Sequence, residues 1–255
     1  MTKRATGSMS RRSTMTTIDL LPGLTAFSTL RGCTEPEAPY DGFNACHYTG
    51  DSPLHVEACR AALGPDIVIP RQTHSLNVAY VDSPGMPEGV DALVTTRPGL
   101  LLCVHTADCV PLVMADREAG VIAAVHSGWR GTVGRIAALA LRRMVSAGAD
   151  PRRVVAAMGP CICADCFEVG PEVAQAFRDA GLAEAILPRE PRPHIDLPLA
   201  VRLTLMAEGV ADSAIAAPAG CSRCRPDLWF SARRLGVNSG RTLTAIALPS
   251  RPDGK

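Results

Sequence analysis

Short apolar runs separated by turn residues constrain the fold of this chain most strongly. Three of them, residues 100–104, 110–114 and 121–125, lie close together in the middle of the sequence. Each has the length of a buried strand rather than of a helix. The runs therefore predict neighbouring strands, with Pro111 and the glycines after residue 126 at their breaks.

Helical spacing follows directly after the third run. Residues 132–148 place Ile136, Leu139, Ala140 and Met144 on one face and arginines on the other, which predicts an amphipathic helix. Further predicted elements are a strand at 154–158, helices at 171–180 and 198–209, and a final strand at 243–248. The strands on either side of Pro111 are too close for a crossover helix, so we expect a hairpin-like pair and a mixed sheet in an α/β chain of the α+β type.

Composition favours a single enzyme-sized domain. The chain has 255 residues, 47% of them hydrophobic, which suffices for one substantial core. A net charge of +1 predicts no nucleic-acid partner, and no stretch reaches the ~18 uncharged apolar residues of a membrane span. We expect a flexible basic tail at 1–17 without a signal peptide, a catalytic domain at 18–250, a tail at 251–255 and a cytoplasmic location. The sequence defines no oligomeric state.

Three residues have the chemistry of an open metal site. His74 in QTHS, Cys109 in TADC and His126 in AVHSG offer two imidazoles and a thiol. Catalytic zinc typically takes three such ligands and leaves a fourth position open. Cys109 and His126 should both lie at strand ends. The spacing is unlike that of a zinc finger, so these residues alone leave a buried core cysteine and hydrogen-bonded histidines as alternatives.

A run of motifs carries a family resemblance. QTHS, DALVTT, TADCVPL, AVHSGWRGTVG and GPCI followed by FEVG occur in that order between Gln72 and Val169. They resemble the YfiH-type family, also called laccase-domain or multicopper polyphenol oxidase-like proteins and regarded as purine nucleoside phosphorylases. The likeness extends to residues 27–51 and to the late CSRC and FSARR segments. It implies one compact domain of packed mixed sheets flanked by helices, with a metal pocket at the sheet ends.

The resemblance also implies an activity. It points to zinc-dependent phosphorolysis of adenosine, inosine, guanosine and methylthioadenosine to the base and ribose 1-phosphate or methylthioribose 1-phosphate, and to deamination of adenosine to inosine. Purine nucleosides and phosphate would be the partners, and His74, Cys109 and His126 the zinc ligands. Zinc lowers the pKa of a bound water from about 15.7 towards about 7. Asp108 could move a proton or orient a histidine, or could be only a turn residue.

Phosphorolysis requires groups that bind an anion. Arg130 offers a bidentate guanidinium, and a helix beginning near Gly131 would add backbone N–H groups. Trp129 could stack on the substrate, although tryptophan at such a junction also serves packing. Arg31 and Asn44, in the segment that resembles the opening of the family, are further substrate-binding candidates.

Other residues remain open. Arg233 and Arg234 are weaker candidates for phosphate or ribose contacts, and His105, four positions before Cys109, could support the metal site. The cysteines form a CxCxxC cluster and a CxxC pair that could close a structural zinc or iron–sulfur site: Cys161, Cys163, Cys166, Cys221 and Cys224. The family resemblance accounts for Cys161 and the CxxC pair without a second metal, and Cys163 stands where a glycine is usual.

Three other functions compete with zinc chemistry. A copper-dependent polyphenol oxidase would need many histidines, and the chain has six, of which three are already assigned. A metal-free hydrolase could use Cys109 as nucleophile and His126 as base. A non-catalytic binding module would leave the open metal site unexplained.

Overall fold

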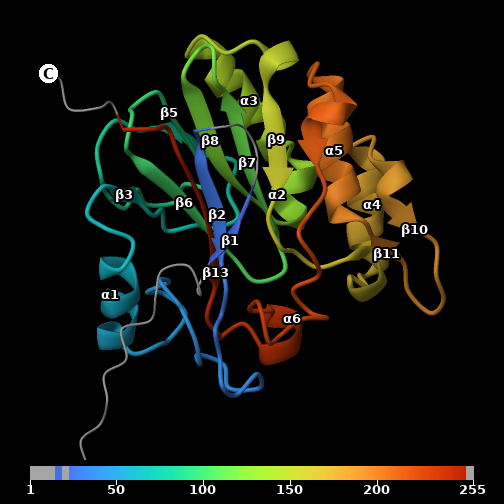
Figure 1. Cartoon of the computed structure of the whole chain (residues 1–255). Coiled ribbons are helices and arrows are strands. Elements are labelled where there is room, and N and C mark those ends of the chain that lie inside the picture. Colours follow the sequence, from blue (N-terminus) through green and yellow to red (C-terminus); the bar gives the residue numbers. More distant parts are fainter. Residues whose placement is uncertain (1–14, 19–22, 251–255) are drawn as a thin grey trace, which may run out of the picture.

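The predicted strands form two β-sheets that pack face to face in the computed structural model, which describes residues 15–18 and 23–250 (Figure 1). The first sheet contains, in spatial order, β1 (Met15–Thr17), β2 (Thr25–Thr29), β13 (Thr242–Ala247), β6 (Leu101–Thr106) and β3 (Ile67–Val68). The second contains β12 (Ile215–Ala216), β9 (Val155–Met158), β7 (Val110–Asp116), β8 (Val121–Ser127), β5 (Ala92–Thr95) and β4 (Val78–Tyr80). A separate antiparallel pair joins β10 (Ile186–Leu187) and β11 (His194–Ile195).

Continuous apolar strands explain why two sheets can pack on each other. In β8, Ile122 and Ala124 point into the layer between the sheets, while Val121, Ala123 and Val125 point to the opposite face. A strand buried on both faces needs apolar residues at every position rather than at alternate ones. The six-stranded sheet is therefore the central layer of the molecule.

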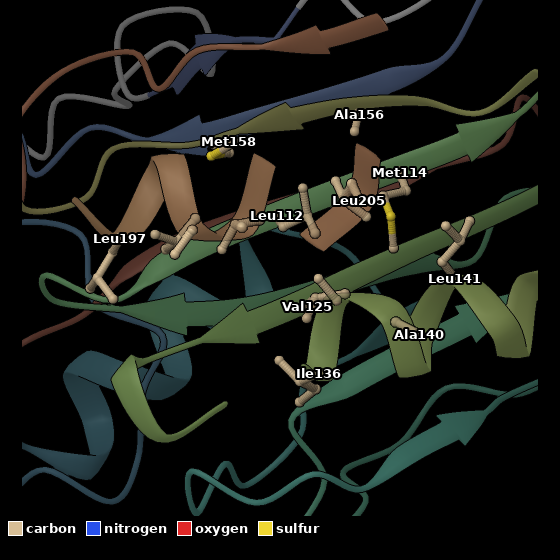
Figure 2. Packing of buried hydrophobic residues seen from close by; sticks show 14 of the residues in the cluster. Leu112, Met114, Val125, Ile136, Ala140, Leu141, Ala156, Met158, Leu197 and Leu205 are labelled. Atoms are coloured by element: carbon tan, nitrogen blue, oxygen red, sulfur yellow. The ribbon is translucent and has the colours of Figure 1, made fainter. Parts of the chain in front are cut away.

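Helices cover the outer face of the six-stranded sheet. The α-helices within residues 23–250 are α1 (Pro53–Ala61), α2 (Trp129–Val133), α3 (Ile136–Ser146), α4 (Pro171–Asp179), α5 (Leu197–Ala207) and α6 (Ala232–Leu235). Ile136 and Leu141 of α3 and Leu205 of α5 pack against Leu112 and Met114 of the sheet (Figure 2). On the other side of the molecule, Cys59 of α1 packs against the five-stranded sheet.

Most predicted elements are confirmed, but the predicted helix at 132–148 is two helices. α2 ends at Val133 and α3 begins at Ile136, with Gly134 and Arg135 between them. Arg135 has a φ of 59°, and its guanidinium donates to the carbonyl of Ala180 at 2.6 Å. The left-handed conformation of Arg135 therefore ends the first helix, and the neighbouring Gly134 contacts Leu76, whose side chain would lie 2.5 Å from a β-carbon at that position.

The expected hairpin around Pro111 is wrong. β6 pairs with β13 and β3 of the five-stranded sheet, whereas β7 pairs with β8 and β9 of the other sheet. The short connection carries Asp108 at a φ of 91° and moves the chain between the sheets. Both sheets are nevertheless mixed, because β3 runs parallel to β6, β4 to β5 and β12 to β9.

The expected flexible tail also needs correction at its end. Residues 15–17, predicted to be part of it, form β1 and pair antiparallel with β2. Residues 1–14 and the predicted tail at 251–255 lie outside the described residues. Within the described part of the chain, no helix has the length and apolar character needed to cross a membrane.

Candidate active site

Two histidines and a cysteine, far apart in the sequence, meet at one end of the interior strands β7 and β8 of the six-stranded sheet. The ligating atoms of His74, Cys109 and His126 all lie within 4.8 Å of one another. Cys109 immediately precedes β7 and His126 lies near the end of β8, so both are at strand ends, as predicted. Cys109 Sγ and His74 Nε2 are 3.8 Å apart, close to the ~3.6 Å expected when both bind one tetrahedral zinc.

The side chains of His74, Cys109 and His126, called the trio below, differ in exposure. His126 is buried, Cys109 is half-buried and His74 is exposed. The rings of His74 and His126 meet edge to face with centroids 4.7 Å apart. The trio is therefore anchored in the core at one end and reachable from solvent at the other, which suits a site with an open position.

Asp91 organises the trio, and sequence reasoning did not identify it. Its fully buried carboxylate accepts hydrogen bonds from His126 Nδ1 at 2.7 Å and from the backbone N–H groups of Thr73, His74 and Ser75 at 3.2, 3.1 and 2.7 Å. Ser75 adds its hydroxyl at 2.7 Å. One carboxylate thus positions both histidines, including His74 in its left-handed conformation at a φ of 57°. The available sequence signal was an aspartate directly before the apolar run of DALVTT.

The bond to Asp91 determines which nitrogen of His126 is free. When Nδ1 carries the proton donated to the carboxylate, Nε2 keeps its lone pair for a metal. Burial opposes the ionisation of Asp91, but the hydrogen bond and charge of His126 outweigh it and lower the pKa of the carboxyl. Asp91 is therefore a charged partner that strengthens His126 as a ligand.

The thiol of Cys109 is biased towards its ionised form. Burial opposes ionisation, but the charge of His126 and hydrogen bonds from His126 and His74 lower the pKa of Cys109 to about 6. Burial likewise opposes the charge on His126, and Cys109 and Asp91 together raise the pKa of that imidazole. A thiolate available at neutral pH is the form that binds a metal, and it is also the form that acts as a nucleophile.

Gly128 leaves the space that the trio needs. A β-carbon at this position would lie 2.9 Å from Cys109 Sγ and 3.0 Å from His74 Cδ2. Its φ of −75° is accessible to any residue, so the requirement for glycine is steric rather than conformational. The donor set, its spacing and this clearance fit a single Zn²⁺ or copper ion.

Gly128→Ala is expected to lower metal affinity about 10- to 100-fold, because the methyl group displaces two ligands at once. Competition with a chromophoric chelator would measure the change. Gly85→Ala is the matched control, since its β-carbon would meet nothing within 4 Å. Unchanged affinity in Gly128→Ala would show that the ligands do not converge on one ion.

Asp108 lies beside the trio but does not orient a histidine. Its carboxylate accepts hydrogen bonds from Ser222 Oγ and from the backbone N–H of Arg233, both at 2.7 Å. The orienting role expected for Asp108 is wrong in this respect, because Asp91 makes the contact with His126. The two bonds hold Asp108 against the loop before α6.

A cavity of about 340 Å³ is connected to the trio through Gly128 and Asp108. Among its lining residues are Trp129, Phe167, Glu168, Arg192 and Arg233. Trp129 directly follows Gly128, which contacts the trio, and the Arg233 backbone binds Asp108. The cavity combines two aromatic walls with two guanidinium groups, a surface suited to a flat base and an anionic group.

Arg130 is exposed, and its guanidinium lies over the Trp129 ring, 4.4 Å from the centroid. No ion pair involves Arg130 in the described portion of the chain, so the expected alternative of a carboxylate partner is not seen there. α2 begins at Trp129 rather than near Gly131 and has five residues, so it adds little helix dipole. Anion binding at Arg130 would therefore depend on side chains.

Arg234, another arginine expected to contact phosphate or ribose, instead forms an ion pair with Glu37 at 2.5 Å.

Arg31 and Asn44 are buried away from solvent. Arg31 donates to the carbonyls of Asp41 and Pro226, both at 2.8 Å, among others, and lies over the Phe230 ring. Asn44 accepts from the backbone N–H of Arg241 and donates to an Asp51 carboxylate. These contacts occupy both side chains. They connect the segment at residues 27–51 to residues 226–241 near the C-terminus. We leave both residues out of the substrate site.

His105 is buried in β6, and neither of its ring nitrogens has a hydrogen-bond partner within the described residues. Burial is the main cause that lowers its pKa to about 3, so the ring is neutral. Gln72 holds the His105 backbone through bonds of 2.8 and 2.7 Å. Gln72 therefore connects the His74 loop to β6, while the His105 side chain is not part of the trio.

Comparisons with known proteins show which family the chain resembles. Residues 25–249 match the family model described as multi-copper polyphenol oxidoreductase laccase. An adenosine deaminase, RL5, from an unknown prokaryotic organism is 47% identical over 88% of this chain and 94% of its own length. A purine nucleoside phosphorylase of Deinococcus radiodurans is 44% identical over 89% of each chain.

Solved structures of other proteins have the same fold as this chain. The protein YfiH of Bacillus licheniformis superposes with a TM-score of 0.85 at 27% identity, covering 92% of this chain and 96% of that one. YlmD of Geobacillus stearothermophilus superposes with a TM-score of 0.83 at 29% identity, covering 90% and 93%. The family match, the relatives and the shared fold together show that the chain belongs to the YfiH-type, laccase-like family, which is described as multi-copper polyphenol oxidoreductase laccase.

Proposed function

We propose that this protein is a zinc-dependent enzyme that acts on purine nucleosides. It would cleave adenosine, inosine, guanosine and methylthioadenosine with phosphate and would deaminate adenosine to inosine. The observation that carries the proposal is the convergence of His74, Cys109 and His126 beside an aromatic and basic cavity. The names of the relatives, adenosine deaminase and purine nucleoside phosphorylase, support the substrate class.

His74, Cys109 and His126 would hold the zinc ion. Zinc bound there would supply a Lewis acid and activate water for attack at neutral pH. Asp91 keeps Nε2 of His126 free and holds the His74 loop in place, so the ligands need little rearrangement when the ion binds.

The cavity residues would bind and orient the nucleoside. Trp129 and Phe167 offer faces for stacking on the purine. Arg233 and Arg130 would neutralise the phosphate that attacks C1' of the ribose, and a bidentate guanidinium suits its geometry. In deamination, Asp108 would take the proton released by the attacking water and pass it to the leaving amino group, since its carboxylate is held by Ser222 and Arg233 next to Cys109.

Product analysis tests the proposal directly. Zinc-loaded protein is incubated with each nucleoside, with and without phosphate, and the base, ribose 1-phosphate and inosine are quantified. We expect base and sugar phosphate to appear only with phosphate, and inosine to form from adenosine without it. If no nucleoside is converted under either condition, the proposal fails.

Arg130→Ala is expected to separate the two reactions. Phosphorolysis should fall about 10- to 100-fold in kcat/KM for phosphate, because charge-assisted hydrogen bonds to the anion are lost. Deamination of adenosine needs no phosphate and should change less than about threefold. Arg143→Ala, which removes another exposed arginine stacked on an aromatic ring, is the control. Equal loss of both reactions would assign Arg130 to the nucleoside or to the fold instead.

The ionised Cys109 beside His126 also favours a second candidate, a metal-free cysteine hydrolase. Exhaustive chelation distinguishes the two. The zinc enzyme should lose activity and recover it with added Zn²⁺, whereas a cysteine hydrolase should be unaffected. Stoichiometric copper together with oxidation of phenolic dyes would instead support a laccase-like oxidase, the activity in the description of the family model.

A further inference from the structure

A second cluster of possible metal ligands lies outside the trio. Cys163, Cys166, Cys221 and Cys224 come from two CxxC pairs far apart in the chain, and their four Sγ atoms all lie within 4.8 Å of one another. The Sγ atoms of Cys166 and Cys224 are 3.4 Å apart. All four are free thiols. Four sulfur atoms around one tetrahedral zinc would be about 3.8 Å apart, given Zn–S bonds of about 2.3 Å.

The backbone arranges these sulfur atoms before any ion binds. Residue 161 is bridged to residue 221: Cys161 N–H donates to the Gly220 carbonyl at 3.2 Å, and Ser222 N–H donates to the Cys161 carbonyl at 3.0 Å. The turn Ala164–Cys166 brings Cys166 back towards Cys163. This pairing of two segments in register places the two CxxC turns opposite each other.

Charge and hydrogen bonding at the cluster suit bound thiolates. The backbone N–H of Cys163 donates to Cys221 Sγ at 3.3 Å, and an Arg223 guanidinium nitrogen lies 3.4 Å from Cys166 Sγ. Backbone N–H groups aimed at sulfur and a nearby cation both stabilise thiolate over thiol. A buried hydrophobic role explains Cys161, which is 1% exposed and packs in the core, but not these four partly exposed residues.

We infer that Cys163, Cys166, Cys221 and Cys224 form a closed, structural four-thiolate site for one Zn²⁺ ion, separate from the open site at His74, Cys109 and His126. A closed set of four cysteines is the donor arrangement of structural zinc. An iron–sulfur cluster would need some of the thiolates further apart, because its four cysteines are divided between two or four iron atoms. The inference is independent of the proposed reaction.

The ion would also position the active-site loop. Ser222, between Cys221 and Cys224, donates its hydroxyl to the Asp108 carboxylate, and the N–H of Ile162, next to Cys163, donates to the Asp108 carbonyl at 2.9 Å. Both segments tied by the four-thiolate site thus hold the residue that precedes Cys109. The site acts on the trio through Asp108 and is a positioning element, not a catalytic one.

Metal counting tests the inference. Purified, zinc-replete protein should contain two Zn²⁺ per chain, and Cys109→Ser should contain one. Cobalt(II) exchanged into Cys109→Ser should show the intense thiolate-to-cobalt charge-transfer absorption of a four-sulfur site. The double variant Cys166→Ser/Cys224→Ser should also retain one ion, now at the trio, and should show only the much weaker charge-transfer absorption of a single thiolate, that of Cys109. Cys33→Ser, a partly exposed cysteine on the neighbouring loop, should keep both ions.

Cys109→Ser keeps the inference testable even if the double variant does not fold. Absence of any bound ion in Cys109→Ser overturns it, as does iron with inorganic sulfide in place of zinc. A disulfide between Cys166 and Cys224 in protein purified without reductant, with one zinc per chain, overturns it as well. Two zinc ions per chain with the expected cobalt spectrum support it.

Discussion

Cys109→Ala and His126→Ala should each lower the rate of every nucleoside reaction at least about 10³-fold. Each change removes one of three ligands, so the remaining pair no longer holds the ion that activates the attacking group. Product formation is measured with each nucleoside, and metal content is measured on the same samples. His126→Ala also removes a partner of the buried Asp91 carboxylate, so the folded fraction is measured by circular dichroism on the same samples and the rates are normalised to it.

Controls of the same residue type separate this effect from general damage. Cys33→Ala and His55→Ala remove a cysteine and a histidine that lie outside the trio and should keep activity within about twofold. If Cys109→Ala remains fully active with bound metal, the trio is not the catalytic centre. If Cys109→Ala is inactive but the parent protein survives chelation, Cys109 acts as a nucleophile instead.

Asp91→Asn should weaken zinc binding at the trio about 10- to 100-fold and lower the free energy of unfolding by about 3 kcal/mol. The amide presents an NH₂ group where the carboxylate accepted hydrogen bonds from Thr73, Ser75 or His126. If the NH₂ faces His126, it favours the tautomer with the proton on Nε2, which cannot bind a metal. Chelator competition and urea unfolding measure the two effects.

Asp116→Asn is a matched control for that prediction. Asp116 is also fully buried and also accepts several hydrogen bonds, including those from the backbone N–H groups of Glu118, Ala119 and Asp150. It is the last residue of β7, at the opposite end of the strand from Cys109. Its substitution should lower stability without changing zinc affinity. Loss of affinity in both variants would mean that Asp91 acts through stability alone.

Local sequence patterns predicted the elements well because they depend on neighbouring residues. The runs at 110–114 and 121–125 are strands that are buried on both faces, which requires a continuous apolar sequence. The spacing after residue 132 is helical, because a helix buried on one face has apolar residues every three or four positions. The break between the two helices was missed, since it lies at Arg135, which is in the left-handed conformation and bonds the distant Ala180 carbonyl. The division of the strands between the two sheets was missed because it depends on distant segments. β6 pairs with β13 and β7 with β9.

The candidate site divides in the same way. His74, Cys109 and His126 could be selected from residue chemistry and motif resemblance, but Asp91 could not. Its role follows from the pairing of β5 with β8, which sets Ala92 against Val125 and brings Asp91 next to His126. Among the late cysteines, the spacings were visible and Cys163 stood out from the family pattern, but only the structure places Cys161 in the core and Cys163 with Cys166, Cys221 and Cys224.

The sequence by itself determined which segments are strands and helices, which residues have metal-binding chemistry, and which family the motifs resemble. Only the tertiary structure decided how the sheets divide the strands, which carboxylate supports the histidines, and which four cysteines converge. The physical reason is that periodicity and side-chain chemistry are local properties of the chain. Strand pairing, burial and convergence of ligands depend on contacts between residues that are distant in the sequence.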